Sequence, residues 1–367
     1  MAETTLISAT TLTALLAQSA APPQLTPYCG ALTPRQLDAP QQEIAALVSA
    51  VAVHDLGWLR RVAVRGEDRF RWLSGMVTNA VNELPANGLA WNLVLNAQGR
   101  ILGDLHVSRQ GDTLELSLAA NQYERLLAHL DHFIIMDDVE LVPLPEVSAL
   151  GLSGPRAADL LAELGLPVPD EPMTSAQAAW RGFEISVVRN YGVPAPHFEL
   201  WMQASEIPSL WRVLTEAGAI PVGSAALEAF RVAEAIPLYG SDIVERDLPQ
   251  ETSQMRTLNF SKGCYQGQEI VERIRSRGSV HRHLRPLELF GPLPSPGAEL
   301  TLEAGTAKED AAAGLITSAA ELLLDPGKRI FALAMIRGDA ELRSQSFSYT
   351  VGTVAGTARI LPTPPKF

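Results

Sequence analysis

The sequence predicts a mixed α+β protein with two or three domains. The chain has 367 residues, which is too many for one core of ordinary size. Hydrophobic residues make up 47% and charged residues 19% of the chain, and this composition is typical of a globular protein. Strand and helix patterns alternate through the first two thirds of the chain, and the remaining tail is rich in strand patterns.

The first third of the chain predicts a helical start followed by alternating elements. A helix, a turn containing proline and glycine, and a second helix through Gln41–Val51 are expected first. A short strand at 62–64 and a helix at 66–77 follow, because apolar residues recur there at helical spacing. The remaining elements expected in this part are strands at 91–96, 101–107, 114–118 and 139–142 and a helix at 122–133.

The middle of the chain predicts a ferredoxin-like unit. We expect a strand at 147–152, a helix at 155–164, a proline-containing loop at 166–178, strands at 183–189 and 198–202, and helices at 207–217 and 224–235. This strand–helix–strand–strand–helix order is the split βαβ pattern. Gly291–Gly297 then indicates a domain boundary, and strands at 315–318, 330–336 and 346–354 predict a small β-barrel or jelly roll after it.

The charge and cysteine content exclude several functional classes. The net charge is −12, so the chain as a whole does not attract a nucleic-acid backbone. Cys29 and Cys264 are the only two cysteines, which excludes a disulfide framework and favours a reducing, cytoplasmic location. The N-terminus has no basic region typical of a secretory signal, and no apolar run reaches the ~20 residues of a membrane span.

One local basic stretch, Arg273–Arg285, departs from the overall acidity. It is a candidate for tRNA contact, although such stretches are more often a solvated helix face and loop. Its basic side chains are Arg273, Arg275, Arg277, His281, Arg282, His283 and Arg285. His281 and His283 lie close in sequence but have no cysteine or carboxylate at ligand spacing, so we expect no metal site. The chain also lacks the GxxxxGK[ST], HExxH and GxSxG motifs.

The most specific motif is an eight-residue run, Lys262-Gly263-Cys264-Tyr265-Gln266-Gly267-Gln268-Glu269. It places Cys264 on a glycine-flanked loop, beside Lys262 and just before a predicted helix. A cation and free backbone N–H groups both lower the pKa of a thiol, so Cys264 is a candidate reactive thiolate. The alternative is a buried cysteine that acts as a small hydrophobe, which the polar, glycine-rich surroundings disfavour.

This run resembles the signature of the YgfZ-type folate-binding proteins, which are relatives of the glycine-cleavage T-protein, an aminomethyltransferase. Five other segments resemble that superfamily. Gly66–Val81 resembles its Gly-x-Asp-Ala-x-x-Phe-Leu-x-x-Met-x-Thr-Asn-Asp-Val element, and Phe230–Gly240 resembles Leu-Arg-Leu-Glu-Ala-Gly-x-Pro-Leu-Tyr-Gly. Ala52–Gly57 and Gly99–Leu105 are similar to two further elements, and Phe198–Leu200 stands where the superfamily has Gly-Phe-Glu-Ile.

The resemblance implies a three-domain GcvT-like (T-protein-like) architecture around a central folate-type cavity. The implied divisions are an N-terminal folate-binding domain at 1–145, a ferredoxin-like middle domain at 146–225, a return segment carrying the cysteine motif at 226–288, and a C-terminal β-barrel at 289–367. By matching motif, Asp104, Glu199 and Arg231 are the expected tetrahydrofolate contacts. A carboxylate such as Glu199 can accept two hydrogen bonds from the donor edge of a pterin.

The resemblance also implies what the protein does. YgfZ-type proteins support the assembly or repair of iron–sulfur enzymes, including tRNA-modifying ones, so the expected partners are folate and iron–sulfur client or assembly proteins. In that function Cys264 is the reactive thiol, Lys262 its cationic neighbour, and Gln268 and Glu269 organise the loop. Cys264 alone cannot hold a cluster, which takes about four ligands.

The alternative function is that of an enzyme, a tetrahydrofolate-dependent aminomethyl or one-carbon transferase. Three departures from the aminomethyltransferase pattern count against it. Gly103 replaces the first aspartate of a pair, the pterin-contacting tyrosine is lost or displaced to Tyr191, and Leu118 stands where an asparagine is expected, with Asn121 close by.

Overall fold

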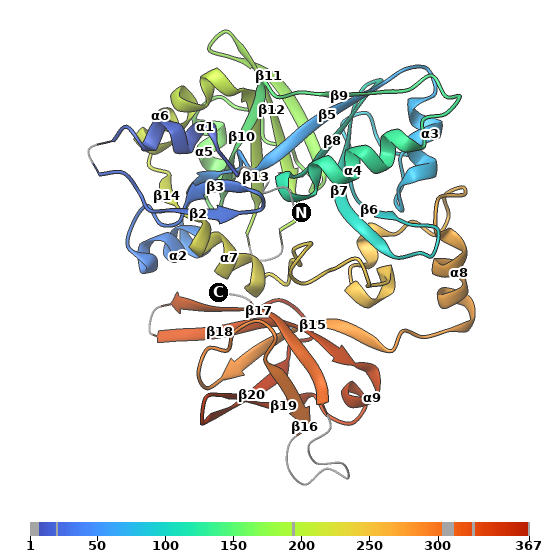
Figure 1. The fold of residues 1–367 in the computed structure, drawn as a ribbon. Helices are drawn as coiled ribbons and strands as arrows, with labels where there is room; N and C mark the ends of the chain where they lie inside the picture. The colour runs from blue at the N-terminus through green and yellow to red at the C-terminus, as the bar shows by residue number, and fades with distance from the viewer. Residues whose placement is uncertain (1–6, 20, 193–194, 303–311, 325–326, 366–367) are drawn as a thin grey trace. The chain divides into compact units, whose positions relative to one another are not determined.

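The computed structural model describes residues 7–19, 21–192, 195–302, 312–324 and 327–365. The chain divides into two compact units. The first contains Met1–Asn92 and Leu105–Leu227, and the second contains Leu93–Asp104 and Glu228–Phe367. Figure 1 labels the helices and strands of both units.

The first unit contains a six-stranded sheet in the order β11-β12-β13-β10-β4-β14. Because side chains alternate along a strand, one face of this sheet carries Val53, Leu150, Leu152, Phe198 and Leu200, which belong to one buried apolar cluster. The same cluster also contains Leu160 and Leu161 of α5 and Leu210 and Leu214 of α6. The bounds are β4 (Ala52–Asp55), β10 (Val147–Ser153), β11 (Thr174–Trp180), β12 (Phe183–Asn190), β13 (His197–Gln203), β14 (Ile220–Val222), α5 (Ala157–Glu163) and α6 (Ile207–Glu216).

Two further sheets are formed by the N-terminal half of the chain. A five-stranded sheet has the order β6-β7-β8-β5-β9, and a three-stranded sheet has the order β1-β3-β2. The division into units passes through β6 and β7, whose connecting turn belongs to the second unit. The bounds are β1 (Ser8–Ala9), β2 (Leu25–Tyr28), β3 (Ala31–Pro34), β5 (Leu59–Arg65), β6 (Leu89–Leu95), β7 (Ile101–Gln110), β8 (Thr113–Ala119), β9 (Glu140–Pro143), α1 (Thr11–Leu16), α2 (Pro40–Ser49), α3 (Arg69–Met76) and α4 (Ala120–His132).

The second unit contains a closed six-stranded barrel in the order β15-β18-β17-β16-β19-β20 (Figure 1). Phe347, Tyr349 and Ile336 are among the side chains that fill its core. The bounds are β15 (Arg282–Phe290), β16 (Glu299–Leu302), β17 (Ala312–Leu324), β18 (Gly327–Arg337), β19 (Ser346–Val351), β20 (Val354–Ile360) and α9 (Gly338–Glu341). Before the barrel come the end of α7 (Ser224–Ala233), three-residue and four-residue 3-10 turns, and α8 (Gln268–Arg277).

The predicted fold class is confirmed, since the chain is α+β with a β-barrel near its C-terminus. Three local predictions were wrong. The loop expected at 166–178 contains the start of β11, the first turn contains the β2–β3 hairpin, and 346–354 holds two strands, β19 and the start of β20. Prolines at 22, 23, 27 and in 167–172 hid the first two, because proline is read as a strand breaker although edge strands tolerate it.

The barrel begins earlier than the sequence suggested. Its first strand, β15, starts at Arg282, so Gly291–Gly297 connects two strands of the barrel rather than preceding it. β15 carries Arg282, His283 and Arg285 and contains Pro286, and this composition obscured its strand pattern. The other proposed domain boundaries stay a prediction.

Ala235, just after α7, adopts a left-handed backbone conformation with φ +59°, where the superfamily pattern has glycine. A Cβ in this region costs about 1 kcal/mol. Ala235→Gly is therefore expected to raise the free energy of unfolding by about 0.5–1 kcal/mol in urea titrations. Ala229→Gly, inside α7, is the control and should lower it by about 1 kcal/mol. A loss of stability at both positions would contradict this account of Ala235.

Candidate functional site

The cysteine motif forms a closely packed turn that leads into α8. Tyr265 is buried in an apolar cluster with Leu93, Leu95, Ile101 and Val271. Burial, together with the nearby charge of Glu272, raises the pKa of Tyr265 to about 12, so its hydroxyl stays protonated. Tyr265 therefore fixes the motif to the β6–β7 turn within the second unit.

Gly267 precedes α8 and requires the absence of a side chain. Its φ is +80°, and a Cβ would lie 2.6 Å from the carbonyl oxygen of Asn96 and 3.0 Å from the Cα of Gly99. The two backbone segments can approach this closely only because both residues are glycine.

Gly267→Ala is expected to lower the free energy of unfolding by about 1–2 kcal/mol or more, measured by urea titration. The strained φ and the contact with the backbone oxygen of Asn96 both contribute, and neither can relax by a side-chain rotation. Gly263→Ala is the matched control, because nothing lies within 4 Å of the Cβ position there. Equal effects at the two glycines would contradict the packing role of Gly267.

Lys262 and Cys264 differ sharply in exposure. Lys262 is 7% exposed, and its ammonium lies 5.1 Å from the centroid of the Tyr265 ring, a cation–π arrangement. Cys264 is exposed, as is Gly263 beside it. The motif thus presents the thiol at the surface while the lysine is held inside. The predicted pairing of Lys262 with the thiol stays a prediction.

Gln268 and Glu269 begin α8. Glu269 lies in the first turn and is exposed, which suits a carboxylate at a helix N-terminus. Val271 is the buried residue of this helix among those described. Tyr265 and Gly267 therefore have a clear packing role, whereas the exposed thiol of Cys264 has none.

Glu199 lies on β13 of the first unit, and its side chain is half-buried. Its Oε1 accepts a hydrogen bond from Asn190 Nδ2 at 2.8 Å, and its Oε2 accepts one from Trp201 Nε1 at 2.7 Å. Burial raises the pKa of Glu199, while those two donors, Arg61 and His197 act to lower it. Each carboxylate oxygen keeps a second lone pair, so the group can still accept from a ligand.

A cluster of two histidines and a serine stands beside Glu199, and the sequence analysis did not find it. Ser153 Oγ lies 2.9 Å from His54 Nε2 and 2.8 Å from His197 Nδ1. The three residues are on β4, β10 and β13, far apart in sequence. The signal available was a lone histidine in the apolar run Val51–Leu56, which is more often a satisfied core residue.

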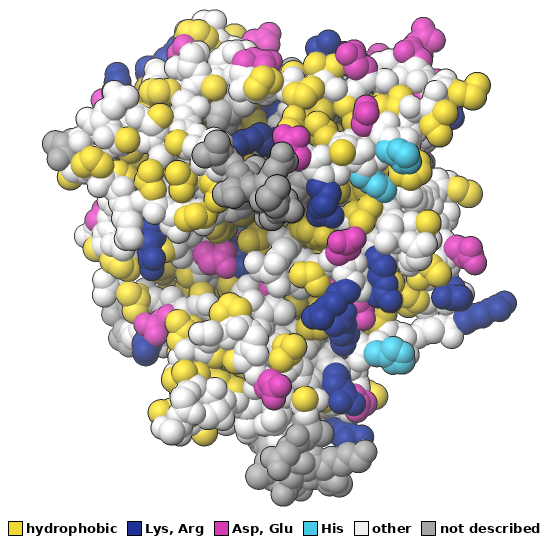
Figure 2. All heavy atoms as spheres, in the orientation of Figure 1, with side chains coloured by type: hydrophobic (Ala, Val, Ile, Leu, Met, Phe, Trp, Pro, Cys, Tyr) yellow, Lys and Arg dark blue, Asp and Glu magenta, His cyan; other side chains and the backbone are white. Residues whose placement is uncertain are grey.

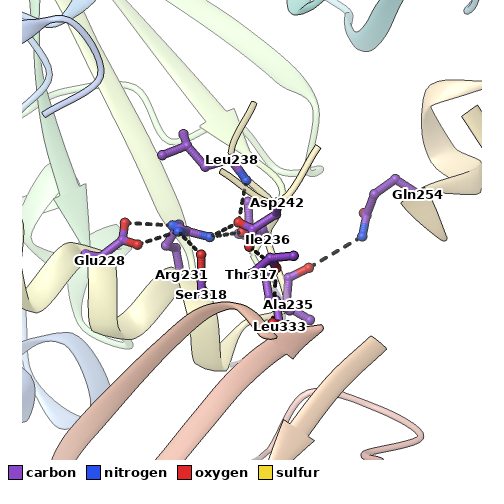
Figure 3. Close-up of polar contacts among 10 residues, drawn as sticks. All are labelled: Glu228, Arg231, Ala235, Ile236, Leu238, Asp242, Gln254, Thr317, Ser318 and Leu333. Carbon is purple, nitrogen blue, oxygen red and sulfur yellow. Dashed lines mark hydrogen bonds and ion pairs between the residues drawn. The ribbon is translucent and has the colours of Figure 1, made fainter. Parts of the chain in front are cut away.

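Arg231 is the centre of a polar network in the second unit (Figure 3). Its Nε donates to Glu228 Oε2 at 2.7 Å, and its Nη2 donates to Glu228 Oε1 and to Ser318 Oγ at 2.9 Å. Its Nη1 donates to the carbonyl oxygen of Ile236 at 3.0 Å and to Asp242 Oδ2 at 2.6 Å. All five N–H groups of the guanidinium are therefore engaged by protein atoms.

Asp104 lies on β7 and is half-buried, between buried Gly103 and Leu105. Asp104 and Arg231 belong to the second unit, whereas Glu199 belongs to the first. The folate contacts proposed for the three residues stay predictions.

The basic stretch Arg273–Arg285 is split between a helix and a strand. In β15, Arg282 pairs with Asp247 and Glu251, and Arg285 pairs with Glu341. His283 also lies against Glu341. On the face in Figure 2, acidic side chains lie among the Lys and Arg side chains. Arg273–Arg285 therefore does not form one continuous basic surface.

Among the residues that the structure describes, Arg273 and Arg277 of α8 are exposed and have no ion pair. No group of three or more His, Cys, Asp or Glu side chains in the described ranges is arranged to hold a metal ion. Within the same ranges, no helix is both long enough and apolar enough to cross a membrane.

Comparison with known proteins identifies the family. The GCVT N-terminal domain matches residues 23–262. The chain is 29% identical over 281 residues to an aminomethyltransferase of Rubrobacter xylanophilus, covering 73% of each chain. It is 26% identical over 227 residues to the tRNA-modifying protein YgfZ of Yersinia enterocolitica, covering 61% of this chain and 66% of the relative.

Among solved structures, the glycine cleavage system aminomethyltransferase T of Bartonella henselae has a similar fold. The TM-score is 0.84, the sequence identity is 19%, and 98% of each chain is covered. At that identity the likeness concerns the fold alone. Since the family match covers more than half of the sequence, this chain belongs to the GCVT N-terminal domain family, the family of the aminomethyltransferase T-proteins.

Proposed function

We propose that this protein is a YgfZ-type folate-binding accessory protein that supports the assembly or repair of iron–sulfur enzymes, including tRNA-modifying ones. The observation that carries the proposal is the exposed thiol of Cys264 on a motif in which Lys262, Tyr265 and Gly267 are used for packing. Thiolates are the usual protein ligands of iron–sulfur clusters.

A single cysteine would act on a cluster only together with ligands from a client protein or a small thiol. Its exposure allows such a partner to approach. Lys262 and Tyr265 anchor the loop from inside, and Gly263 beside the thiol leaves room for a partner, because nothing lies within 4 Å of its Cβ position. Gln268 and Glu269 complete the turn into the helix.

The folate part of the proposal rests on Glu199 and on the family. The carboxylate of Glu199 keeps free lone pairs while two donors fix its orientation, which suits the donor edge of a reduced pterin such as tetrahydrofolate. Asp104 and Arg231 remain proposed folate contacts by their places in the superfamily motifs alone. A ligand group at Arg231 would have to replace one of its five protein partners.

The test is complementation of a strain that lacks its endogenous YgfZ-type protein. The readout is the activity of an iron–sulfur enzyme under oxidative stress. Wild type and the control Ser261→Ala, an exposed position just before the motif, should restore activity. Cys264→Ala should not restore it, although it folds and accumulates normally. Full complementation by Cys264→Ala would refute the role of the thiol.

The enzyme alternative is favoured by the similar aminomethyltransferases and disfavoured by Gly103 and Leu118. It predicts formation of methylenetetrahydrofolate from an aminomethylated lipoyl carrier. Clear turnover in that assay would replace the accessory function as the main activity.

We also propose that any tRNA contact is limited to α8, where Arg273 and Arg277 are exposed. Binding should weaken steeply with salt and be lost in the double variant Arg273→Gln, Arg277→Gln. Absence of binding at low salt would end this part of the proposal.

A further inference from the structure

The face of the six-stranded sheet opposite the apolar cluster carries a row of polar side chains. Pairing places His54 of β4 opposite Gly151 of β10, and Gly151 opposite Glu199 of β13. In the adjacent row, Ser153 lies opposite His197. Since directly paired residues share a face, all five lie on the same side of the sheet.

The imidazole ring of His54 occupies the space that a side chain at Gly151 would need. A Cβ at Gly151 would lie 1.9 Å from His54 Cε1 and 2.4 Å from either ring nitrogen. The imidazole therefore lies directly over the backbone of Gly151, between its own strand and the strand of Glu199. Only glycine at this position leaves room for it.

The hydrogen bonds of Ser153 restrict where the protons lie. A hydroxyl has one proton to donate, so Ser153 can donate to one imidazole and must accept from the other. His54 is neutral, because burial and the charge of His197 lower its pKa to about 3. When His197 carries a proton on both nitrogens, its Nδ1–H donates to Ser153, and Ser153 then donates to His54 Nε2.

The proton of His54 is then on Nδ1. That atom is buried and has no hydrogen-bond partner among the described residues. His54 thus accepts a hydrogen bond from Ser153 but does not carry the positive charge. The charge of this cluster resides on His197, which is the half-buried member nearest in sequence to Glu199.

Two charged or titratable groups among the described residues lie near Glu199 and His197: His54 on β4 and Arg61 on β5. Arg61 lies 4.7 Å over the ring of Trp201 and is paired with Glu115, which offsets its charge. Arginine keeps its charge, whereas a histidine can be neutral or charged. His197 is therefore the cation in this group whose charge is not fixed.

We propose that His197 controls the charge of Glu199, with Ser153 and His54 holding its imidazole in place. Burial opposes ionisation of Glu199, and a positive charge on His197 favours the carboxylate. This inference rests on the proposed folate-binding function. In that function the ionised carboxylate of Glu199 accepts two N–H donors from the 2-amino-4-oxopyrimidine edge of a pterin. His197 thus becomes a positioning residue for that ligand.

The first test needs no ligand. Protein carrying ¹³C-labelled glutamate is titrated by infrared spectroscopy, and Glu199→Gln identifies the band of Glu199. In His197→Asn the carboxylate of Glu199 should form at higher pH than in wild type, whereas the exposed control His281→Asn should match wild type. His197→Gln serves if His197→Asn does not fold. An unchanged Glu199 titration in the folded variant would overturn the inference.

The second test measures the dissociation constant of 5-formyltetrahydrofolate across pH 5.5–8.5. At the acid end of this range, His197→Asn should bind more weakly than wild type, and the difference should shrink as rising pH ionises Glu199 in both proteins. Equal affinities at every pH would overturn the ligand role of His197. If wild type binds no folate at all, the proposed function loses its folate part, and the infrared titration still decides the role of His197.

Discussion

Replacing Arg231 with leucine is expected to lower the free energy of unfolding by about 3–5 kcal/mol. The side chain of Asp242 is fully buried and accepts from Arg231 Nη1 at 2.6 Å, so the variant leaves a buried carboxylate without its cation. The carbonyl oxygen of Ile236 and the hydroxyl of Ser318 lose donors as well. The measurement is urea unfolding, followed by a signal from the barrel of the second unit.

Arg273→Leu is the matched control, because that arginine is exposed on α8 and has no ion pair among the described residues. It should change the free energy of unfolding by less than about 0.5 kcal/mol. The variant Asp242→Asn should be destabilising too, and its effect should not add to that of Arg231→Leu, because the two residues act as one pair. Equal effects of Arg231→Leu and Arg273→Leu would show that the network in Figure 3 contributes little.

The contacts of Arg231 could not be predicted from the sequence pattern around it. The superfamily pattern at Phe230–Gly240 singled out Arg231, but it could not distinguish an arginine that contacts a ligand from one that fixes the backbone. That distinction depends on Ser318 and Thr317, which are distant in sequence and meet Arg231 and Asp242 only in the fold. Long-range polar partners of this kind leave no periodic signal.

The cysteine motif was predicted more completely. Its position before a helix followed from the apolar spacing of Ile270, Val271 and Ile274, and α8 begins at Gln268. The sequence did not predict which side chains of the motif are buried and which are exposed. Lys262 is buried although lysine is almost always exposed, because its ammonium faces the ring of Tyr265.

The strands of the first unit were also predicted only in part. Alternating patterns located β10, β12 and β13, and Glu199 was assigned to β13. The cluster of His54, Ser153 and His197 was missed, because it requires the order of the strands in the sheet, and that order brings β4 beside β10. A sequence pattern gives the face of a strand but not its neighbours.

His54 is expected to make the first unit sensitive to acid. Its pKa falls from 6.5 to about 3 in the folded state, by burial and by the charge of His197. Because the folded pKa is below the unfolded pKa, the unfolded chain takes up the proton first as the pH falls. This contribution is fully present above pH 6.5, is lost progressively below it, and amounts to at most about 5 kcal/mol.

Asp55, the next residue, acts in the opposite direction over part of the same range. Burial raises its pKa from 3.8 to about 6, although hydrogen bonds from Thr10 and the backbone of Gly57 lower it in part. The folded state therefore binds this proton first, and Asp55 adds stability as the pH falls from about 6 to about 4. Wild type shows only the difference between the two contributions.

Comparison of wild type with His54→Gln separates them. The variant should be less stable at pH 7, because the contacts of the imidazole with Ser153 and Gly151 are lost. It should then lose much less stability than wild type between pH 6.5 and 4.5, and the Asp55 contribution can even raise its stability over that interval. Urea midpoints at four pH values measure both slopes, with the exposed His281→Gln as the control that keeps the wild-type slope. If His54→Gln and wild type lose stability in parallel, the acid sensitivity arises elsewhere, and His54 is not held neutral by its burial.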